Sequence, residues 1–308
     1  MRLATRCLFQ SAGFLACGLA AAGLSGEPLR IATYNLGNYL ETGRRVEGRR
    51  LPDYPKPEAE KRALRRVVLS VRPDVLALQE IGPPEYLEEL RADLAAQGLG
   101  FSHAAHMDSV DGQRNLAVLS QVPIRSAIHH DDLVFKYFGQ REPVKRGLLE
   151  VELATGADPD DSLCLFVVHL KSRFSSEPKD PESAKRRVSE AEACRDRIVE
   201  RLSGSGPALY CVAGDFNDHP ESATVRRFCQ RGDLRIGQRV PAGDERGETW
   251  THHYGKRGMY STVDGFVVSP GLVPRIVGSK GRIFGDLAGS DHRLVYIDVD
   301  TQLETAPD

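Results

Sequence analysis

The sequence predicts one α+β domain that follows a short N-terminal export segment, and three observations lead to this prediction. Eight short apolar runs have the length and composition of strands, whereas only four segments have helical periodicity. Many strands with few helices favour an α+β domain over repeated βαβ units. Hydrophobic residues make up 41% of the 308 residues and charged residues 27%, which excludes a disordered, collagenous or membrane-embedded chain.

The first 26 residues differ in composition from the rest of the chain. Arg2 and Arg6 give a basic start, residues 7–24 are mostly apolar, and this run ends in small residues at 20–23. This pattern predicts a signal peptide over residues 1–26, one domain over residues 27–308, and an exported protein that is periplasmic or extracellular. An uncleaved anchor and lipidation at Cys17 are the alternatives. No later stretch has the roughly 20 apolar residues of a membrane span, so we expect none in the mature chain.

The predicted strands are apolar runs bounded by polar or turn residues, and no break in composition divides them into two domains. They comprise residues 29–34, 74–79, 116–119, 148–153, 163–170, 209–213, 263–268 and 294–299. Two segments rich in basic residues or proline, 41–57 and 172–181, are predicted to be loops between elements.

The helices are predicted from apolar residues at helical spacing. Residues 64, 67, 68 and 71 form such a stripe, and further helices are expected over 85–97 and 223–229. The longest helix is predicted to follow Asp180 as N-cap with Pro181 in its first turn. Its apolar stripe comprises Ala184, Val188, Ala191, Ile198 and Leu202.

Charge and cysteine content limit the partners that we expect. Without residues 1–26 the chain has 39 basic and 43 acidic residues, a net charge of −4, so contact with nucleic acid requires a local basic patch. Arg44, Arg45, Arg49 and Arg50, together with residues 185–187, could form such a patch, and a solvated face is the alternative. The four remaining cysteines fit no zinc pattern. Cys194 and Cys229 could pair in an oxidising compartment, whereas Cys164 and Cys211 are expected to be buried thiols.

Polar residues interrupt or end the apolar runs at several places. These residues are Asn35, Glu80, His169, Asp215, Asn217, Asp264, Asp291 and His292. Burial of a carboxylate or imidazole is costly without a partner, so these side chains lie either in solvent or together at one rim of the sheets. Singly, each has an ordinary structural interpretation, such as a turn residue. Together, two amides, four carboxylates and two histidines suit Mg²⁺ or Mn²⁺ better than Zn²⁺, beside an acid–base pair.

The order of these motifs resembles that of the endonuclease/exonuclease/phosphatase superfamily, which includes DNase I-like nucleases, inositol polyphosphate phosphatases and neutral sphingomyelinases. The motifs are Ile31-Ala32-Thr33-Tyr34-Asn35-Leu36, Pro73-Asp74 with Gln79-Glu80, His169-Leu170-Lys171-Ser172, Gly214-Asp215-Phe216-Asn217 and Ser290-Asp291-His292. The resemblance implies a four-layer α-β-β-α sandwich of the DNase I-like type with its site at one edge. One departure is Gly265, which follows Asp264 where an aromatic residue is more usual.

The resemblance also implies a role for each residue. Glu80 would be the principal Mg²⁺ ligand, with Asn35 beside it and Asp291 completing the metal shell. His292 would activate water or hold the phosphate oxygens, and Asp264 would orient its ring. Asp215 would align the nucleophile, Asn217 would bind the scissile phosphate, and His169 would assist the leaving group.

Two basic residues are further candidates for contact with the substrate. Arg114 precedes the predicted strand 116–119 at a place where family members carry a phosphate contact, with a polar turn as the alternative. Lys171 lies two residues after His169 and would share its strand face by period-two geometry. A solvated lysine at the strand end is equally compatible with the sequence. Trp250, before the Asp264 strand, could stack on a base but is expected to pack in the core.

These observations predict an exported, Mg²⁺-dependent (or Mn²⁺-dependent) monomeric phosphodiester hydrolase that is nuclease-like and acts on nucleic acid or another phosphodiester. The first alternative is a phospholipid-directed, sphingomyelinase-like enzyme or a phosphatase. A sphingomyelinase-like enzyme would need an exposed apolar hairpin, and the sequence outside the signal contains no obvious apolar run of that kind. The second alternative is a non-catalytic binding module with the same fold, which the complete set of polar residues argues against.

Overall fold

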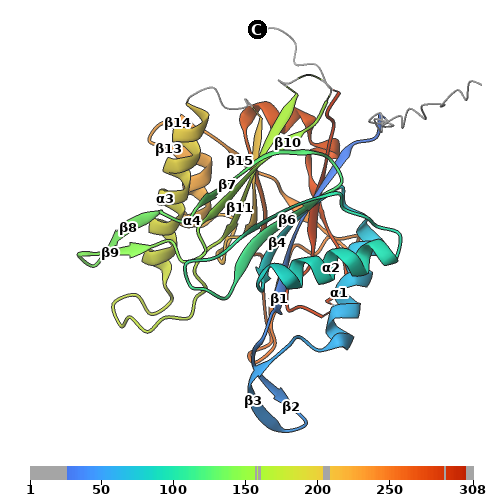
Figure 1. The fold of residues 1–308 in the computed structure, drawn as a ribbon. Coiled ribbons are helices and arrows are strands. Elements are labelled where there is room, and N and C mark those ends of the chain that lie inside the picture. The colour runs from blue at the N-terminus through green and yellow to red at the C-terminus, as the bar shows by residue number, and fades with distance from the viewer. Residues whose placement is uncertain (1–25, 157, 159–160, 204–208, 288, 303–308) are drawn as a thin grey trace, which may run out of the picture.

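Two β-sheets pack face to face, and each carries two helices on its outer face, in the predicted α-β-β-α order (Figure 1). The computed structural model describes residues 26–156, 158, 161–203, 209–287 and 289–302. The predicted signal peptide therefore lies outside the described residues, apart from Gly26. None of the described helices is both long and apolar enough to cross a membrane.

The first sheet has seven strands, with β1 and β4 near its centre. Its order is β16 (Ala242–Gly243), β20 (Gly281–Ile283), β21 (Val295–Val299), β1 (Leu29–Tyr39), β4 (Val75–Ile81), β6 (Asn115–Ser120) and β5 (His103–Met107). Strands β1 and β4 are parallel, and β21 is antiparallel to β1.

The second sheet has six strands. Its order is β15 (Gln238–Arg239), β19 (Asp264–Val268), β12 (Tyr210–Asp215), β11 (Ser162–His169), β10 (Leu148–Ala154) and β7 (Ile124–His130). Strands β11 and β12 are parallel, and β19 is antiparallel to β12. All eight predicted strands therefore lie in the two sheets, while β5, β7 and the short strands were not predicted.

Three apolar clusters hold the layers together. The inner cluster lies between the sheets and includes Ile31, Val75 and Leu165. Neighbouring residues such as Ala32 and Leu76 point to the opposite face and pack under the first pair of helices, as the period of two in a strand requires. Because both faces of the central strands are buried, these strands are apolar throughout and do not alternate with polar residues.

The four helices cover the outer faces of the sheets. α1 (Glu58–Val71) and α2 (Pro84–Ala96) pack on the seven-stranded sheet, whereas α3 (Ala184–Leu202) and α4 (Ala223–Cys229) pack on the six-stranded sheet. The predicted stripe of α1 is buried as expected. Two short 3₁₀ helices, η1 (Pro270–Arg275) and η2 (Val277–Ser279), precede β20.

The start of α3 corrects the sequence prediction. The helix begins at Ala184, with Ser183 in a left-handed conformation before it, so Pro181 is not in its first turn. Asp180 nevertheless binds the helix start, because its carboxylate accepts the backbone N–H groups of Lys185 and Arg186 at 3.2 and 3.0 Å. Two residues of the predicted stripe, Ala191 and Ile198, are buried as expected, and two others are half-buried. Ala184 is exposed, and two arginines and a glutamate are buried that were not predicted to be.

Four two-stranded hairpins complete the described part of the fold, and one of them corrects a predicted loop. The predicted loop 41–57 contains a hairpin of β2 (Thr42–Val46) and β3 (Arg49–Tyr54), which projects from the lower edge in Figure 1. The other pairs are β8 (Val134–Tyr137) with β9 (Gln140–Pro143), β13 (Gln230–Arg231) with β14 (Leu234–Arg235), and β17 (His252–Tyr254) with β18 (Met259–Ser261). The possible Cys194–Cys229 disulfide is not formed: Cys164, Cys194, Cys211 and Cys229 are free thiols.

The strand directions bring the predicted site residues to one edge. β1, β4, β11 and β12 all end at the lower edge in Figure 1, and the antiparallel strands β19 and β21 begin there. Residues at the carboxyl ends of the first four strands therefore meet residues at the amino ends of the last two.

Gly214 gives a test of how closely these strands pack. Its φ is +145°, and a Cβ atom there would lie 2.0 Å from the carbonyl oxygen of Val168 on β11. We expect Gly214→Ala to lower the free energy of unfolding by at least about 3 kcal/mol, measured by urea titration, because β12 must separate from β11. Gly232→Ala is the control: Gly232 also has a positive φ, +58°, but open space around it, so about 1 kcal/mol should be lost. Equal losses in the two variants would contradict the close approach.

Candidate active site

Asp215, at the end of β12, is the residue on which the two sheets converge. Its Oδ2 accepts hydrogen bonds from the amide of Asn35 on β1 (3.1 Å) and from the amide of Asn217 (3.0 Å). The Nε2 atoms of His169 and His292 lie 3.6 and 3.9 Å from the same oxygen. Asn35 and His292 belong to the first sheet or its loops, and His169 ends a strand of the second, so this contact joins both sheets.

His292 is held against Asp264, at the start of β19. Its Nδ1 lies 2.9 Å from Asp264 Oδ2 and 3.1 Å from Oδ1, and both side chains are almost completely buried. The backbone N–H of His292 donates to Ser290 Oγ, which in turn donates to the carbonyl of Asn35. A carboxylate on Nδ1 fixes the ring and leaves Nε2 facing Asp215.

The two histidines of this cluster differ in pKa because they have different charged neighbours. Burial alone would lower the pKa of His292, but the carboxylates of Asp264 and Asp215 outweigh it and raise the pKa to about 10. Burial lowers the pKa of His169 well below its usual value, and the positive charges of Arg146 and His292 lower it further. Near neutral pH, His292 is therefore an imidazolium and His169 a neutral ring.

Asp215 has an unusual acidity of its own. Burial, followed by the neighbouring Asp264 carboxylate, raises the pKa of Asp215 to about 7, against the opposing effects of His292 and of hydrogen bonds from Asn217 and Asn35. A carboxylate that titrates near neutral pH can accept a proton during a reaction and release it afterwards.

Glu80 reaches the site because β4 is irregular at this residue. The register with β6 shifts between Gln79 and Ile81, and Glu80 itself has a left-handed φ of +60°. Such bulges turn a side chain out of the regular alternation of a strand. Glu80 Oε2 accepts the backbone N–H of Asn38 at 2.8 Å, while Oε1 lies 3.7 Å from Arg114 Nε and 3.8 Å from His169 Nε2.

The oxygen atoms around Glu80 fit a hard cation. Asn38, whose backbone N–H binds the Glu80 carboxylate, has a buried amide oxygen with no hydrogen-bond partner in the described part of the chain. Asn35 uses its amide nitrogen on Asp215 and its oxygen on the N–H of Gly37, so a lone pair of that oxygen is left. With the exposed carboxylate of Asp291, this set offers oxygen ligands of the kind that Mg²⁺ prefers.

Two residues that were predicted to bind the substrate form hydrogen bonds within the protein instead. The amide nitrogen of Asn217 donates to Leu170 O and Asp215, so contact with a phosphate would require it to give up one of these bonds. Lys171 lies beyond the end of β11, so the period-two argument does not apply to it, and its Nζ binds Ser172 and the carbonyl of Phe174. Arg114, by contrast, lies beside Glu80 as a substrate contact would require.

Arg146 is a site residue that the sequence reasoning missed. It is 8% exposed, and its Nε and Nη1 have no hydrogen-bond partner among the residues that the structure describes, although Nε lies 3.3 Å from Asp111 Oδ2. Its charge lowers the pKa of both His169 and Lys171, after the effect of burial. The available signal was its position, since Arg146 stands directly before the apolar run 148–153.

The structure explains why a glycine, Gly265, and not an aromatic residue, follows Asp264. With a φ of +149°, it leaves room for the guanidinium of Arg239, which a Cβ atom would approach to 2.3 Å. Arg239 Nη2 donates to the backbone carbonyl of Asp264 at 2.9 Å. The space of the usual aromatic residue is thus taken by a half-buried cation that binds the backbone of Asp264.

The proposed basic patch is only partly exposed. Arg45, Arg49 and Arg50 are exposed on the β2–β3 hairpin, but Arg186 and Arg187 are buried. Arg186 pairs with Glu190 and Glu142, and Arg187 pairs with Asp218. The prediction that residues 185–187 contribute to an exposed basic patch is therefore wrong for two of these three residues, Arg186 and Arg187.

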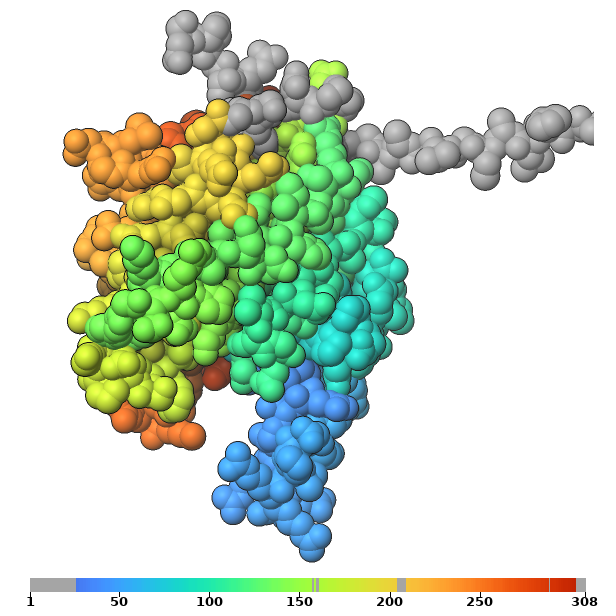
Figure 2. Space-filling model, turned by 60° about the vertical axis from the view of Figure 1, so that its left-hand side comes forward, coloured from blue at the N-terminus to red at the C-terminus, as the bar shows by residue number. Residues whose placement is uncertain are grey.

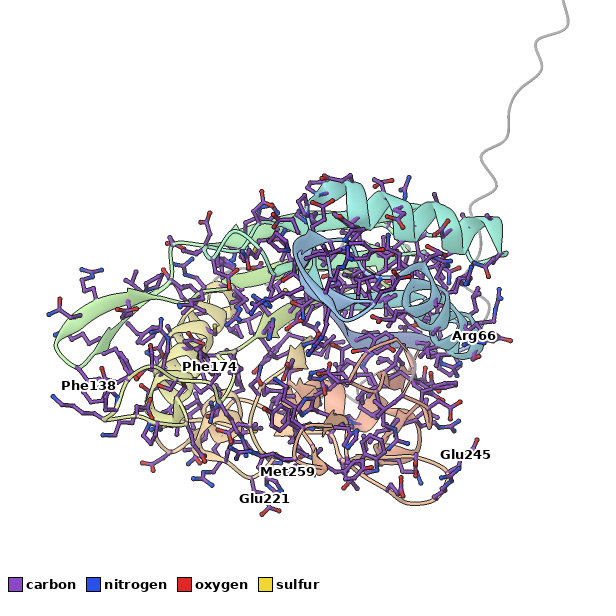
Figure 3. The ribbon with its side chains drawn as sticks, turned by 90° about the horizontal axis from the view of Figure 1, so that it is seen from below. Arg66, Phe138, Phe174, Glu221, Glu245 and Met259 are labelled. Atoms are coloured by element: carbon purple, nitrogen blue, oxygen red, sulfur yellow. The ribbon has the colours of Figure 1, made fainter. Side chains whose placement is uncertain are left out.

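A hollow opens at this edge between projecting hairpins. Figure 2 shows it between the blue β2–β3 hairpin and the orange β17–β18 hairpin, with the red C-terminal part of the chain visible at its back. Figure 3 looks onto the same edge, where the side chains of Met259 and Phe174 are labelled. Trp250 is partly buried under the guanidinium of Arg293, at 4.0 Å, and is not a fully buried core residue.

A scaffold of two packed sheets with paired carboxylates and histidines at one edge defines the DNase I-like class of fold. The model of the endonuclease/exonuclease/phosphatase family matches residues 32–292, and the chain belongs to this family. Members of the family are in general hydrolases that act on phosphoester bonds. A comparison with curated protein sequences gives no match.

Solved structures of this fold extend the comparison. The chain is similar to the human Nocturnin catalytic domain with bound sulfate, at 16% identity and TM-score 0.57 over 88% of this chain and 93% of that one. Sphingomyelinase C from Streptomyces griseocarneus matches at 14% identity and TM-score 0.60 over 88% and 99%. A beta toxin variant from Staphylococcus aureus with bound magnesium ions matches at 12% identity and TM-score 0.60 over the same shares. At these identities the likeness shows the fold.

Removal of the Asp264 charge tests the electrostatic assignment. In metal-free protein we expect the ring of His292 to titrate near pH 10 by NMR, and Asp264→Asn to lower that pKa by at least about one unit, because the imidazolium loses its partner. Asp233→Asn, in an exposed turn, is the charge-matched control and should leave the titration unchanged. A His292 pKa that is the same in wild type and Asp264→Asn would contradict the ion pair.

Proposed function

We propose that this protein is an exported, Mg²⁺-dependent phosphodiester hydrolase that acts on nucleic acid by a single attack of activated water. The observation that carries this proposal is the convergence of His292, Asp264, Asp215, His169 and Glu80 at one open edge. A charged histidine, a carboxylate that titrates near neutral pH and an oxygen-rich cation site are the groups that phosphodiester hydrolysis requires. Residues 1–26 would direct export.

Mg²⁺, or Mn²⁺ in its place, would be held by Glu80, Asn35 and Asp291. Bound there, the cation would neutralise negative charge on the phosphoryl oxygens and so reduce their repulsion of the nucleophile. Arg114, beside Glu80, and Arg146, whose charge acts on His169, add positive charge to the site and would orient the phosphate.

Asp215 and His292 divide the proton chemistry between them. Asp215, with its pKa raised to about 7, would align the water and take its proton. His292 would donate a hydrogen bond from Nε2 to a phosphoryl oxygen, where negative charge increases in the transition state. Asp264 keeps His292 charged and Asn217 keeps Asp215 in place.

His169 is suited to the leaving group. It is neutral, so one of its ring nitrogens can donate a hydrogen bond to the departing oxygen while the other accepts one. Its Nδ1 is buried without a partner among the described residues, and its Nε2 lies between Glu80 and Asp215.

Nucleic acid is favoured as the substrate by the charge of the β2–β3 hairpin. Arg45, Arg49 and Arg50 are exposed at the side of the hollow on a protein with a small negative net charge. These side chains could bind phosphates on either side of the scissile bond.

A phospholipid substrate is the second candidate. The β17–β18 hairpin, which borders the hollow in Figure 2, exposes Tyr254, Met259 and Tyr260. The sequence reasoning did not anticipate this apolar hairpin, because its residues are separated by glycine and basic residues. An exposed aromatic hairpin of this kind could insert into the surface of a lipid bilayer.

Glu80→Gln tests the cation site. We expect the Mg²⁺ concentration for half-maximal hydrolysis of bis-nitrophenyl phosphate to rise at least about tenfold, because a neutral amide replaces the charged ligand. EDTA should abolish activity in the wild type. Glu245→Gln, an exposed carboxylate that points away from the edge in Figure 3, is the control and should behave as wild type. Activity that persists in EDTA would count against a metal-dependent mechanism.

His292→Ala and a panel of substrates test the reaction and the substrate. We expect His292→Ala to lower kcat by at least about 10²-fold on plasmid DNA, and His219→Ala, an exposed histidine, to have no effect. Plasmid DNA and RNA should be cleaved faster than sphingomyelin vesicles or inositol phosphates. Preferential hydrolysis of sphingomyelin would favour the second candidate. A folded protein that is inactive on every substrate would overturn the proposed function.

A further inference from the structure

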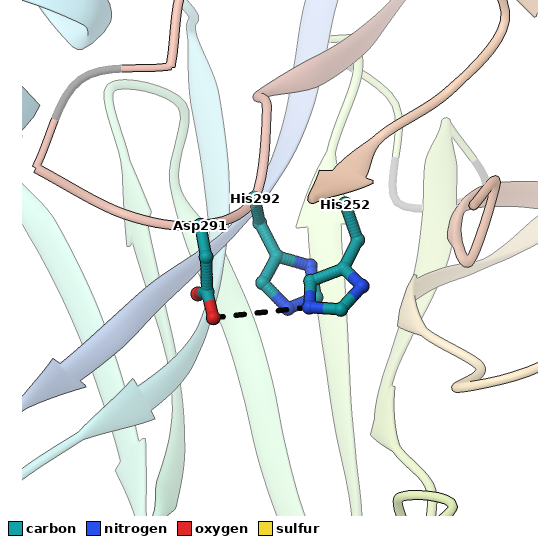
Figure 4. A group of neighbouring side chains, drawn as sticks. All are labelled: His252, Asp291 and His292. Carbon is teal, nitrogen blue, oxygen red and sulfur yellow. Dashed lines mark ion pairs between the residues drawn. The ribbon is translucent and has the colours of Figure 1, made fainter. Parts of the chain in front are cut away.

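His252, at the start of β17, is fixed beside the active site by the backbone. It forms an isolated β-bridge with His292, and the N–H of His253 donates to the carbonyl of Asp291 at 2.9 Å. The rings of His252 and His292 lie 4.6 Å apart between centroids. Figure 4 shows the two rings and the Asp291 carboxylate converging on one point.

Both imidazoles present the same nitrogen to this point. Nδ1 of His292 is bound to the Asp264 carboxylate, and Nδ1 of His252 is bound to the hydroxyl of Ser261 at 3.2 Å. Each Nε2 is therefore left free of these bonds. His252 Nε2 lies 3.7 Å from Asp291 Oδ2, and one ligand atom from each of the three residues lies within 4.8 Å of the others. Histidines that bind metals have this arrangement, with the second ring nitrogen held by a carboxylate or hydroxyl.

The donor set differs in kind from that around Glu80. Two imidazole nitrogens and one carboxylate suit Zn²⁺ and similar transition-metal ions, whereas Mg²⁺ prefers oxygen ligands. Zn²⁺ with three protein ligands keeps a fourth position for water, and its ligand atoms lie about 3.4 Å apart. The ligand atoms of the three residues lie within 4.8 Å of one another, so side-chain rotations of the half-buried His252 and the exposed Asp291 that close at most about 1.4 Å would bring the set to this spacing.

We propose that His252, Asp291 and His292 form a second cation site that binds Zn²⁺ and, when filled, inhibits hydrolysis. The inhibition rests on the proposed function, because Zn²⁺ at this site would displace the proton from Nε2 of His292 into solvent, and that N–H would otherwise donate to the phosphate. Asp291 has two carboxylate oxygens, so it can contribute to this site and to the Mg²⁺ site beside it. His252 serves only the second site.

Direct measurement of binding tests the site without reference to activity. Zn²⁺ affinity is measured on the purified full-length protein by competition with a chromophoric chelator, and Co²⁺ is added separately to record its visible spectrum. We expect wild type to bind one Zn²⁺ and His252→Ala to bind it at least about tenfold more weakly. His252→Phe keeps the ring packed against His292 but lacks the nitrogen, and should lose affinity equally. His253→Ala, on the opposite face of the same strand, is the control and should bind as wild type.

The inhibition is then measured at saturating Mg²⁺. We expect Zn²⁺ to inhibit wild type and His253→Ala, and the inhibitory concentration to rise at least about tenfold in both His252 variants, whose Mg²⁺-supported rate stays near that of wild type. Equal Zn²⁺ affinity in wild type and both His252 variants would overturn the site. Binding through His252 with undiminished hydrolysis would overturn the inhibition. A protein that binds Zn²⁺ through His252 but hydrolyses nothing would support the site and overturn the proposed function.

Discussion

Asp215 and Asp264 occupy neighbouring ends of paired strands, and each is no more than 2% exposed. Two adjacent buried carboxylates cannot both remain ionised unless a positive group lies beside them. His292 is that group, and it comes from the other sheet, from the loop before β21. The packing of the two sheets and the charge state of the site therefore depend on each other. Loss of either carboxylate would change the acidity of the ring, and loss of the ring would leave two charges buried without compensation.

The backbone departs from regular geometry at several positions around this cluster. Glu80 and Asn217 have left-handed conformations, and β4 bulges at Glu80. Gly214 and Gly265 face one another across β12 and β19, where neither position has room for a Cβ atom. Conformations of this kind cost about 1–3 kcal/mol each and persist because the surrounding structure enforces them. Here the continuous core between the sheets holds the strand ends in place.

The sequence predicted the residues of the site better than their contacts. Polar residues at the ends of apolar runs identified Asn35, Glu80 and His169, because burial of such groups requires partners. It could not predict that Asn217 binds the carbonyl of Leu170, or that Arg186 and Arg187 are buried against Glu142 and Asp218, because these partners lie 47, 44 and 31 residues away in the chain. The hairpins were missed for a local reason. β2–β3 turns at Glu47-Gly48 and β8–β9 at Phe138-Gly139, with positive φ at both residues, whereas Asn-Gly and Asp-Gly are the usual signals of such turns.

The free cysteines have a consequence for where the protein can work. Cys164, Cys194 and Cys211 are enclosed in the layers, and burial raises the pKa of each thiol, so they remain protonated and shielded from oxidants. The described part of the chain thus has no covalent crosslink whose formation would depend on redox conditions. Its described part is held together by packing, hydrogen bonds and ion pairs, none of which forms or breaks with the redox state of a thiol.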